Sequence, residues 1–182
     1  FYLQLGHGLR KKTRAASPAI RLGGPRGALC ERMRKLLPFQ LTGAQERVLQ
    51  EIDADLGGDQ PMQRLVQGDV GSGKTMVAWL ASLRAIEHGR QALWMAPTEI
   101  LAEQHYRGLH KFAEALGISA ALLTAATPAR EKKALLARIA SGDISFVIGT
   151  HALIQEEVRA PLMGLGVVDE QHRFGVMRRL SL

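Results

Sequence analysis

The sequence predicts an α/β protein built on a parallel β-sheet flanked by helices on both faces. First, short apolar segments alternate along the chain with longer segments of helical periodicity. Second, the apolar segments lack the in–out alternation of half-exposed strands, as is typical of strands buried on both faces. Third, a glycine-rich turn lies between a strand segment and a helix segment at 68–75. Together these observations indicate βα units wound around one sheet.

The composition fits this class. The chain has 182 residues, 46% hydrophobic and 23% charged, which is ordinary for a soluble globular protein. No apolar run approaches the ~20 residues of a membrane helix, so we expect no membrane partner. Cys30 is the only cysteine, which excludes an internal disulfide and is compatible with a cytoplasmic location. We expect Cys30 to be a small helix residue rather than a catalytic thiol.

The positive charge is concentrated near the start of the chain. The net charge is +7, yet residues 1–38 carry nine Lys or Arg and one acid. We predict a basic helical connector over 1–38, with one helix up to about residue 16 and a short one over 28–37. Its charge suits either contact with a polyanion or a solvated linker, and neither is favoured. We place a domain boundary at Pro38-Phe39, so that 39–182 forms the α/β domain.

The elements of this domain follow in order. Thr42 and Gln45 form a capping box that opens a helix ending at Gly57. Thr127 is expected to cap a later helix with Pro128 as its first residue. The predicted strands are 64–67, 91–96, 118–124, 144–149 and 165–169, and the further predicted helices are 74–88, 98–116, 128–140 and a short one at 151–156.

Residues 68–75 match the phosphate-binding pattern GxxxxGK[ST]. Glycines let successive N–H groups point inward, and the following helix adds its positive end. Lys74 would reach the β- and γ-phosphates of ATP, and the Thr75 hydroxyl would ligate Mg²⁺. A glycine-rich turn that happens to contain Lys-Thr is the plainer alternative. The predicted nucleotide-binding residues are Gly68, Asp69, Val70, Gly71, Ser72, Gly73, Lys74 and Thr75.

A second signal is acidic and follows the last predicted strand. Asp169 can hold Mg²⁺ at the strand end, and Glu170 is placed to polarise the attacking water. Alone, an acidic pair after a strand indicates little more than an acidic turn. Together with a phosphate loop on the same sheet, it strongly indicates a nucleotide site. Gln171 and His172 could sense hydrolysis, although the residues alone favour a surface turn.

Two other strand ends carry polar groups. Thr98 and Thr150, with helix N–H groups behind them, could hold backbone phosphates of a nucleic acid, or they could only cap helices. The candidate DNA-binding residues are Pro97, Thr98, Gly149, Thr150 and His151. Gln45 could recognise adenine through its amide, or serve only in the capping box, and we weigh both readings equally.

These motifs resemble the superfamily 2 helicases, and among them the RecG branched-DNA helicases. The matching strings are LTGAQ at 41–45, GDVGSGKT at 68–75, APTEILAEQH at 96–105, IGTHAL at 148–153 and VVDEQHRFGV at 167–176. The transcription-repair coupling factors usually carry Tyr in place of Ser72 and an acidic-Gln pair in place of Gln171-His172. The chain agrees with RecG at both places.

The resemblance implies a RecA-like domain that uses ATP and Mg²⁺ to move on branched duplex DNA, at stalled forks and Holliday junctions, in recombination and repair. It implies that Lys74, Thr75, Asp169 and Glu170 handle the phosphates, metal and water, and that Gln171 and His172 couple hydrolysis to motion. It also implies that the segments 96–105 and 149–151 face DNA. Residues 1–38 resemble the tail of the N-terminal wedge region.

The resemblance further implies a second RecA-like domain, with an arginine finger, after Leu182. We therefore expect this chain to be a fragment that hydrolyses ATP poorly on its own, because such a finger contributes on the order of 10³–10⁵ in rate. Two alternatives stay open, namely another superfamily 2 translocase and a nucleotide-binding module without motor activity.

Overall fold

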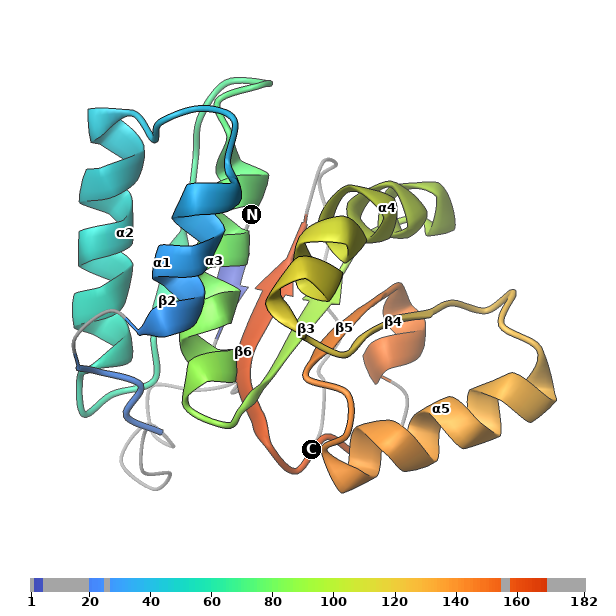
Figure 1. The fold of residues 1–182 in the computed structure, drawn as a ribbon. Helices are drawn as coiled ribbons and strands as arrows, with labels where there is room; N and C mark the ends of the chain where they lie inside the picture. Colours follow the sequence, from blue (N-terminus) through green and yellow to red (C-terminus); the bar gives the residue numbers. More distant parts are fainter. Residues whose placement is uncertain (1, 5–19, 25–26, 155–157, 170–182) are drawn as a thin grey trace.

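The computed structural model describes residues 2–4, 20–24, 27–154 and 158–169. Within these ranges, six strands form one sheet in the order β2-β1-β6-β3-β5-β4 (Figure 1). The strands β6, β3, β5 and β4 run parallel, which confirms the predicted fold class. The strand bounds are β1 Tyr2–Gln4, β2 Gln63–Leu65, β3 Gln91–Met95, β4 Ala120–Leu123, β5 Phe146–Gly149 and β6 Met163–Val168.

Helices cover both faces of the sheet, as predicted. Trp94 and Phe146 pack with α1 to α4 on one face, and their rings meet edge to face at 5.6 Å. Leu93 and Val147, one residue away on the same strands, pack with α5 on the other face. The helix bounds are α1 Ala28–Leu36, α2 Gly43–Leu56, α3 Lys74–Glu87, α4 Glu99–Leu116, α5 Ala129–Ser141 and the 3₁₀ helix η1 His151–Ile154.

The helix starts follow the local sequence. The capping box of α2 is present, because Gln45 N–H donates to the Thr42 hydroxyl and Thr42 N–H donates to the Gln45 amide oxygen. The prediction for α5 is wrong in detail. Pro128 is its N-cap rather than its first residue, and the Thr127 hydroxyl accepts the N–H of Thr124 instead. The threonine therefore closes the turn before the helix.

The predicted N-terminal helix is wrong at Tyr2–Gln4, which form the strand β1. Residues 5–19 lie outside the described part. Strand β1 pairs antiparallel with both β2 and β6, and Tyr2 lies opposite Leu65 on one side and Val168 on the other. It thereby supplies hydrogen-bond partners to the facing edges of two strands, which local periodicity cannot reveal.

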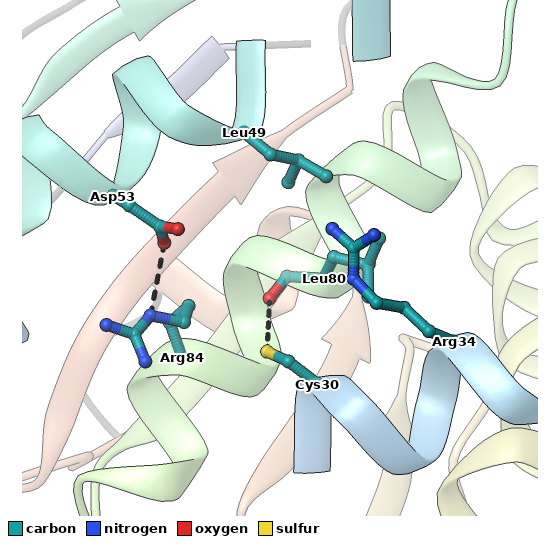
Figure 2. A pocket seen from close by; sticks show the side chains of 6 residues that line it. All are labelled: Cys30, Arg34, Leu49, Asp53, Leu80 and Arg84. Atoms are coloured by element: carbon teal, nitrogen blue, oxygen red, sulfur yellow. Dashed lines mark hydrogen bonds and ion pairs between the residues drawn. The ribbon is translucent and has the colours of Figure 1, made fainter. Parts of the chain in front are cut away.

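Residues 20–24 and 27–37 pack against α3. Leu22, Cys30 and Met33 belong to the same hydrophobic core as α3. The buried Cys30 thiol donates to the Leu80 carbonyl oxygen (Figure 2), as expected of a small helix residue. The boundary at Pro38-Phe39 stays a prediction.

Three side chains near the end of α3, which we call the connector clamp, hold this segment: Arg84, Glu87 and His88. Arg84 is 2% exposed and donates to the carbonyl oxygens of Leu22 and Gly24. His88 Nε2 lies 3.2 Å from the Gly23 carbonyl oxygen.

Acidic groups complete the attachment. The Glu87 carboxylate accepts hydrogen bonds from the backbone N–H groups of Gly27, Leu29 and Cys30. These groups lie at the start of α1, where the helix dipole favours an anion. Arg84 also forms an ion pair with Asp53 at 3.1 Å, so it joins α2 to the clamp. Figure 2 shows the small cavity where these helices meet, lined by Cys30, Arg34, Leu49, Asp53, Leu80 and Arg84.

No helix in the described part of the chain is both long and apolar enough to cross a lipid bilayer.

Candidate nucleotide-binding site

The phosphate-binding loop connects β2 to the start of α3. Gly71 and Gly73 have positive φ angles of 81° and 79°, a conformation that favours glycine. Gly73 is the N-cap of α3, and residues 68–72 are exposed. The positive end of a long helix therefore opens towards solvent beside a loop of backbone N–H groups, an arrangement suited to binding phosphate.

Lys74 lies over this loop. Its ammonium group donates to the carbonyl oxygens of Gly68 at 2.8 Å and Asp69 at 2.7 Å. The side chain is half-buried and begins on the first residue of α3. Its charge is thus held close to the loop N–H groups, where the charge of a triphosphate would be neutralised.

Gln45 joins the start of α2 to the same loop. Its amide oxygen accepts the N–H of Thr42, and its amide nitrogen donates to the Ser72 carbonyl oxygen at 2.9 Å. A Cβ atom on Gly73 would lie 2.3 Å from that nitrogen, so a larger residue there would displace the Gln45 amide, and the positive φ also favours glycine. Gln45 therefore serves the capping box and braces the loop, while adenine recognition stays a prediction.

Asp169 lies directly after β6. Its N–H donates to the Met95 carbonyl oxygen at 2.8 Å, which extends the ladder with β3 by one residue. The residue is 7% exposed. Its Oδ2 atom lies 2.7 Å from Nε2 of His105, a residue of α4. The predicted partners Glu170, Gln171 and His172 lie outside the described residues.

Sequence reasoning did not single out His105, although a signal was available. The buried residues of α4 are Ala102, Leu109, Ala113 and Leu116, which recur at helical spacing. His105 falls on the same stripe, three residues after Ala102 and four before Leu109. A polar group in an apolar stripe requires a partner inside the protein, and here the partner is Asp169.

The oxygen atoms of Thr75 and Asp169 are of the kind that binds Mg²⁺. Thr75 lies half-buried in the first turn of α3, and Asp169 supplies a carboxylate with little exposure to water. No group of three or more His, Cys, Asp or Glu side chains able to hold a metal occurs among the described residues. Mg²⁺ needs none, because it is commonly bound by one or two carboxylates together with water and substrate phosphates.

The candidate DNA-binding residues lie at the carboxyl ends of β3 and β5, which are neighbours in the sheet. Met95 pairs with Gly149, so Pro97 and Thr98 lie at the same edge as Thr150 and His151. Thr98 caps α4 by accepting the N–H of Leu101. This confirms the capping role of Thr98, while contact with DNA phosphates stays a prediction.

Gly149 has a structural reason to be glycine. A Cβ atom there would lie 2.1 Å from the Leu123 carbonyl oxygen of β4 and 2.9 Å from Leu153 Cγ. We expect Gly149→Ala to lower the free energy of unfolding by about 1–3 kcal/mol, measured by thermal or denaturant unfolding, because the strands must shift. The control is Gly108→Ala on α4, which has open space and should keep or raise stability. Equal losses in both variants would contradict the steric argument.

Comparisons with known proteins agree with this geometry. The DEAD/DEAH box helicase family matches residues 42–182. The ATP-dependent DNA helicase RecG of Synechocystis sp. is 48% identical over the whole chain, and that of Bacillus subtilis is 53% identical over 81% of it. A solved structure of RecG bound to a three-way DNA junction superposes with a TM-score of 0.80 at 47% identity, covering 92% of this chain and 23% of that one.

The chain spans 22% of the length of each of the two curated relatives named above. The matched region contains the phosphate-binding loop, Asp169 and both strand ends with polar groups. More than three quarters of the chain matches the family, and the fold agrees with a member of known structure. This chain therefore belongs to the DEAD/DEAH box helicase family, and within it resembles the RecG helicases.

Proposed function

We propose that this chain is the ATP-binding part of an ATP-dependent DNA helicase that acts on branched DNA in recombination and repair. One observation carries the proposal. Strand β1 lies antiparallel between β2 and β6, with Tyr2 facing both Leu65 and Val168. The phosphate-binding loop and Asp169 therefore leave the same edge of the sheet, from strands separated by roughly 10 Å.

This edge suits the binding of ATP with Mg²⁺. The loop N–H groups and Lys74 would hold the phosphates, and Thr75 with Asp169 would ligate the metal. Bound Mg²⁺ would neutralise charge that develops on the phosphates during hydrolysis. Glu170 would orient and activate the attacking water. Gln171 and His172 would couple hydrolysis to movement of a second RecA-like domain of the same protein, which would supply the arginine finger.

The neighbouring edge suits a DNA backbone. Pro97 and Thr98 precede α4, and Gly149, Thr150 and His151 lie beside them at the end of β5. The N–H groups at the start of α4 can donate to DNA phosphates. A solved relative of 47% identity is described as bound to a three-way DNA junction, which supports branched duplex DNA as the partner. A cytoplasmic location is part of the proposal.

The test is the ATPase rate of the intact protein, measured at one salt concentration without DNA, with linear duplex and with a three-way junction. We expect the junction to stimulate hydrolysis most and to be unwound in the presence of ATP. ATP binding without stimulation by any DNA would point to a nucleotide-binding module. Equal stimulation by the linear duplex would point to another translocase of the superfamily.

A further inference from the structure

The hydrogen bond between His105 and Asp169 indicates a role for His105 that the sequence motifs do not assign to it. We propose that His105 is a positioning residue, which fixes the carboxylate of Asp169 in the orientation that receives Mg²⁺ with the nucleotide. The inference rests on the proposed function, since it concerns the same ATP site.

The contact is short and shielded from water. The Nε2 and Oδ2 atoms are 2.7 Å apart, and the two side chains are 14% and 9% exposed. An ionised carboxylate can only accept, so Nε2 carries the hydrogen and donates it. A hydrogen bond to one oxygen restrains rotation of the carboxylate group about its Cβ–Cγ bond. The second oxygen therefore keeps a preferred direction in the absence of metal.

The histidine itself is held in place. It lies on the buried stripe of α4, and its ring meets the Trp94 ring edge to face at 5.7 Å and 75°. Trp94 is 2% exposed, and its indole N–H donates to the Ser82 hydroxyl at 2.8 Å. Ser82 belongs to α3, the helix that begins at the phosphate-binding loop. The imidazole is therefore supported by the helix that carries Lys74.

A merely structural histidine would have different requirements. If His105 only filled space between α4 and the sheet, any side chain of similar size and polarity could replace it without loss of metal binding. If it positions Asp169, the substitute must present an N–H group at the distance of Nε2. Glutamine places its amide nitrogen near that distance, whereas asparagine places it nearer to Nδ1. Groups that orient metal ligands typically change metal affinity 10–100-fold when they are removed.

The experiment compares His105→Asn with His105→Gln in the intact protein. Mn²⁺ serves as the metal probe, and its affinity for the protein–ADP complex is measured by electron paramagnetic resonance. ADP affinity is measured separately in EDTA. We expect His105→Asn to weaken Mn²⁺ binding about 10–100-fold without changing ADP affinity in EDTA. His105→Gln should stay close to the wild type.

The control is His110→Asn, on the same helix. His110 lies five residues after His105 on α4 and pairs with Glu114 at 3.6 Å, and its loss should leave Mn²⁺ affinity unchanged. Equal Mn²⁺ affinities for His105→Asn and His105→Gln would overturn the inference, whether both are normal or both are weak. If the wild-type protein binds neither ADP nor Mn²⁺, the proposed function fails, and the inference fails with it.

Discussion

Replacing Lys74 by alanine is expected to abolish ATP hydrolysis and unwinding by the intact protein. The Lys74 ammonium group lies within 2.8 Å of two loop carbonyl oxygens, so it is already placed beside the phosphate-binding N–H groups. Its loss removes a fixed positive charge from the place where phosphate charge develops. The rate should fall on the order of 10²–10³-fold or more, measured as steady-state phosphate release.

The matched control is Lys111→Ala, which removes the same charge from an exposed position of α4. This variant should keep wild-type hydrolysis, because an exposed lysine far along α4 does not contact the loop. Binding of a fluorescent ATP analogue should weaken in Lys74→Ala alone. Unwinding at the wild-type rate by Lys74→Ala would show that the loop at 68–75 is not the nucleotide site.

The second large effect is expected on stability. Arg84 is 2% exposed and bridges Asp53, Glu87 and the carbonyl oxygens of Leu22 and Gly24. Arg84→Met keeps much of the buried side-chain volume but removes the positive charge that pairs with Glu87, which is 9% exposed, and with Asp53, which is 23% exposed. Loss of one partner of a buried ion pair typically costs about 3–5 kcal/mol. We expect a loss of this size in thermal and denaturant unfolding.

Arg107→Met is the control for this prediction. Arg107 lies on α4 with its side chain 80% exposed and pairs with Glu103 four residues earlier. Such a surface pair contributes about 0.3–0.5 kcal/mol, so the variant should unfold nearly as the wild type does. If Arg84→Met were equally mild, the connector clamp would not hold residues 20–24 and 27–30 to the domain.

Local patterns predicted most of the fold. Predicted and observed boundaries of the main α/β elements agree within two residues, from the helix opened by Thr42 to the last strand. Capping and turn chemistry act over a few residues and can be read directly. The phosphate-binding loop was predictable for the same reason, because glycine, lysine and threonine occupy fixed positions in one contiguous segment.

Features that depend on distant pairing were not predicted. Tyr2–Gln4 pair with strands more than 50 residues away in sequence, whereas a helix was predicted there. His105 and Asp169 are separated by 64 residues. Within the segment 96–105, which contains His105, the sequence patterns singled out Pro97 and Thr98 instead. The contact between His105 and Asp169 forms only because α4 packs against the sheet. In the sequence, only the position of His105 among the buried residues of α4 indicated that it needs a partner. Glu170, Gln171 and His172 stay predictions.

The connector clamp lets α3 join the phosphate-binding loop to the N-terminal part of the chain. This helix starts at Lys74 in the phosphate-binding loop and reaches Arg84 and Glu87 in the clamp. Its 14 residues form a rod about 21 Å long. A tilt of about 5° at the loop end would displace the other end by about 2 Å. Because α3 is one rigid element, any such tilt would also move residues 20–24 and 27–30, which the clamp attaches to its end.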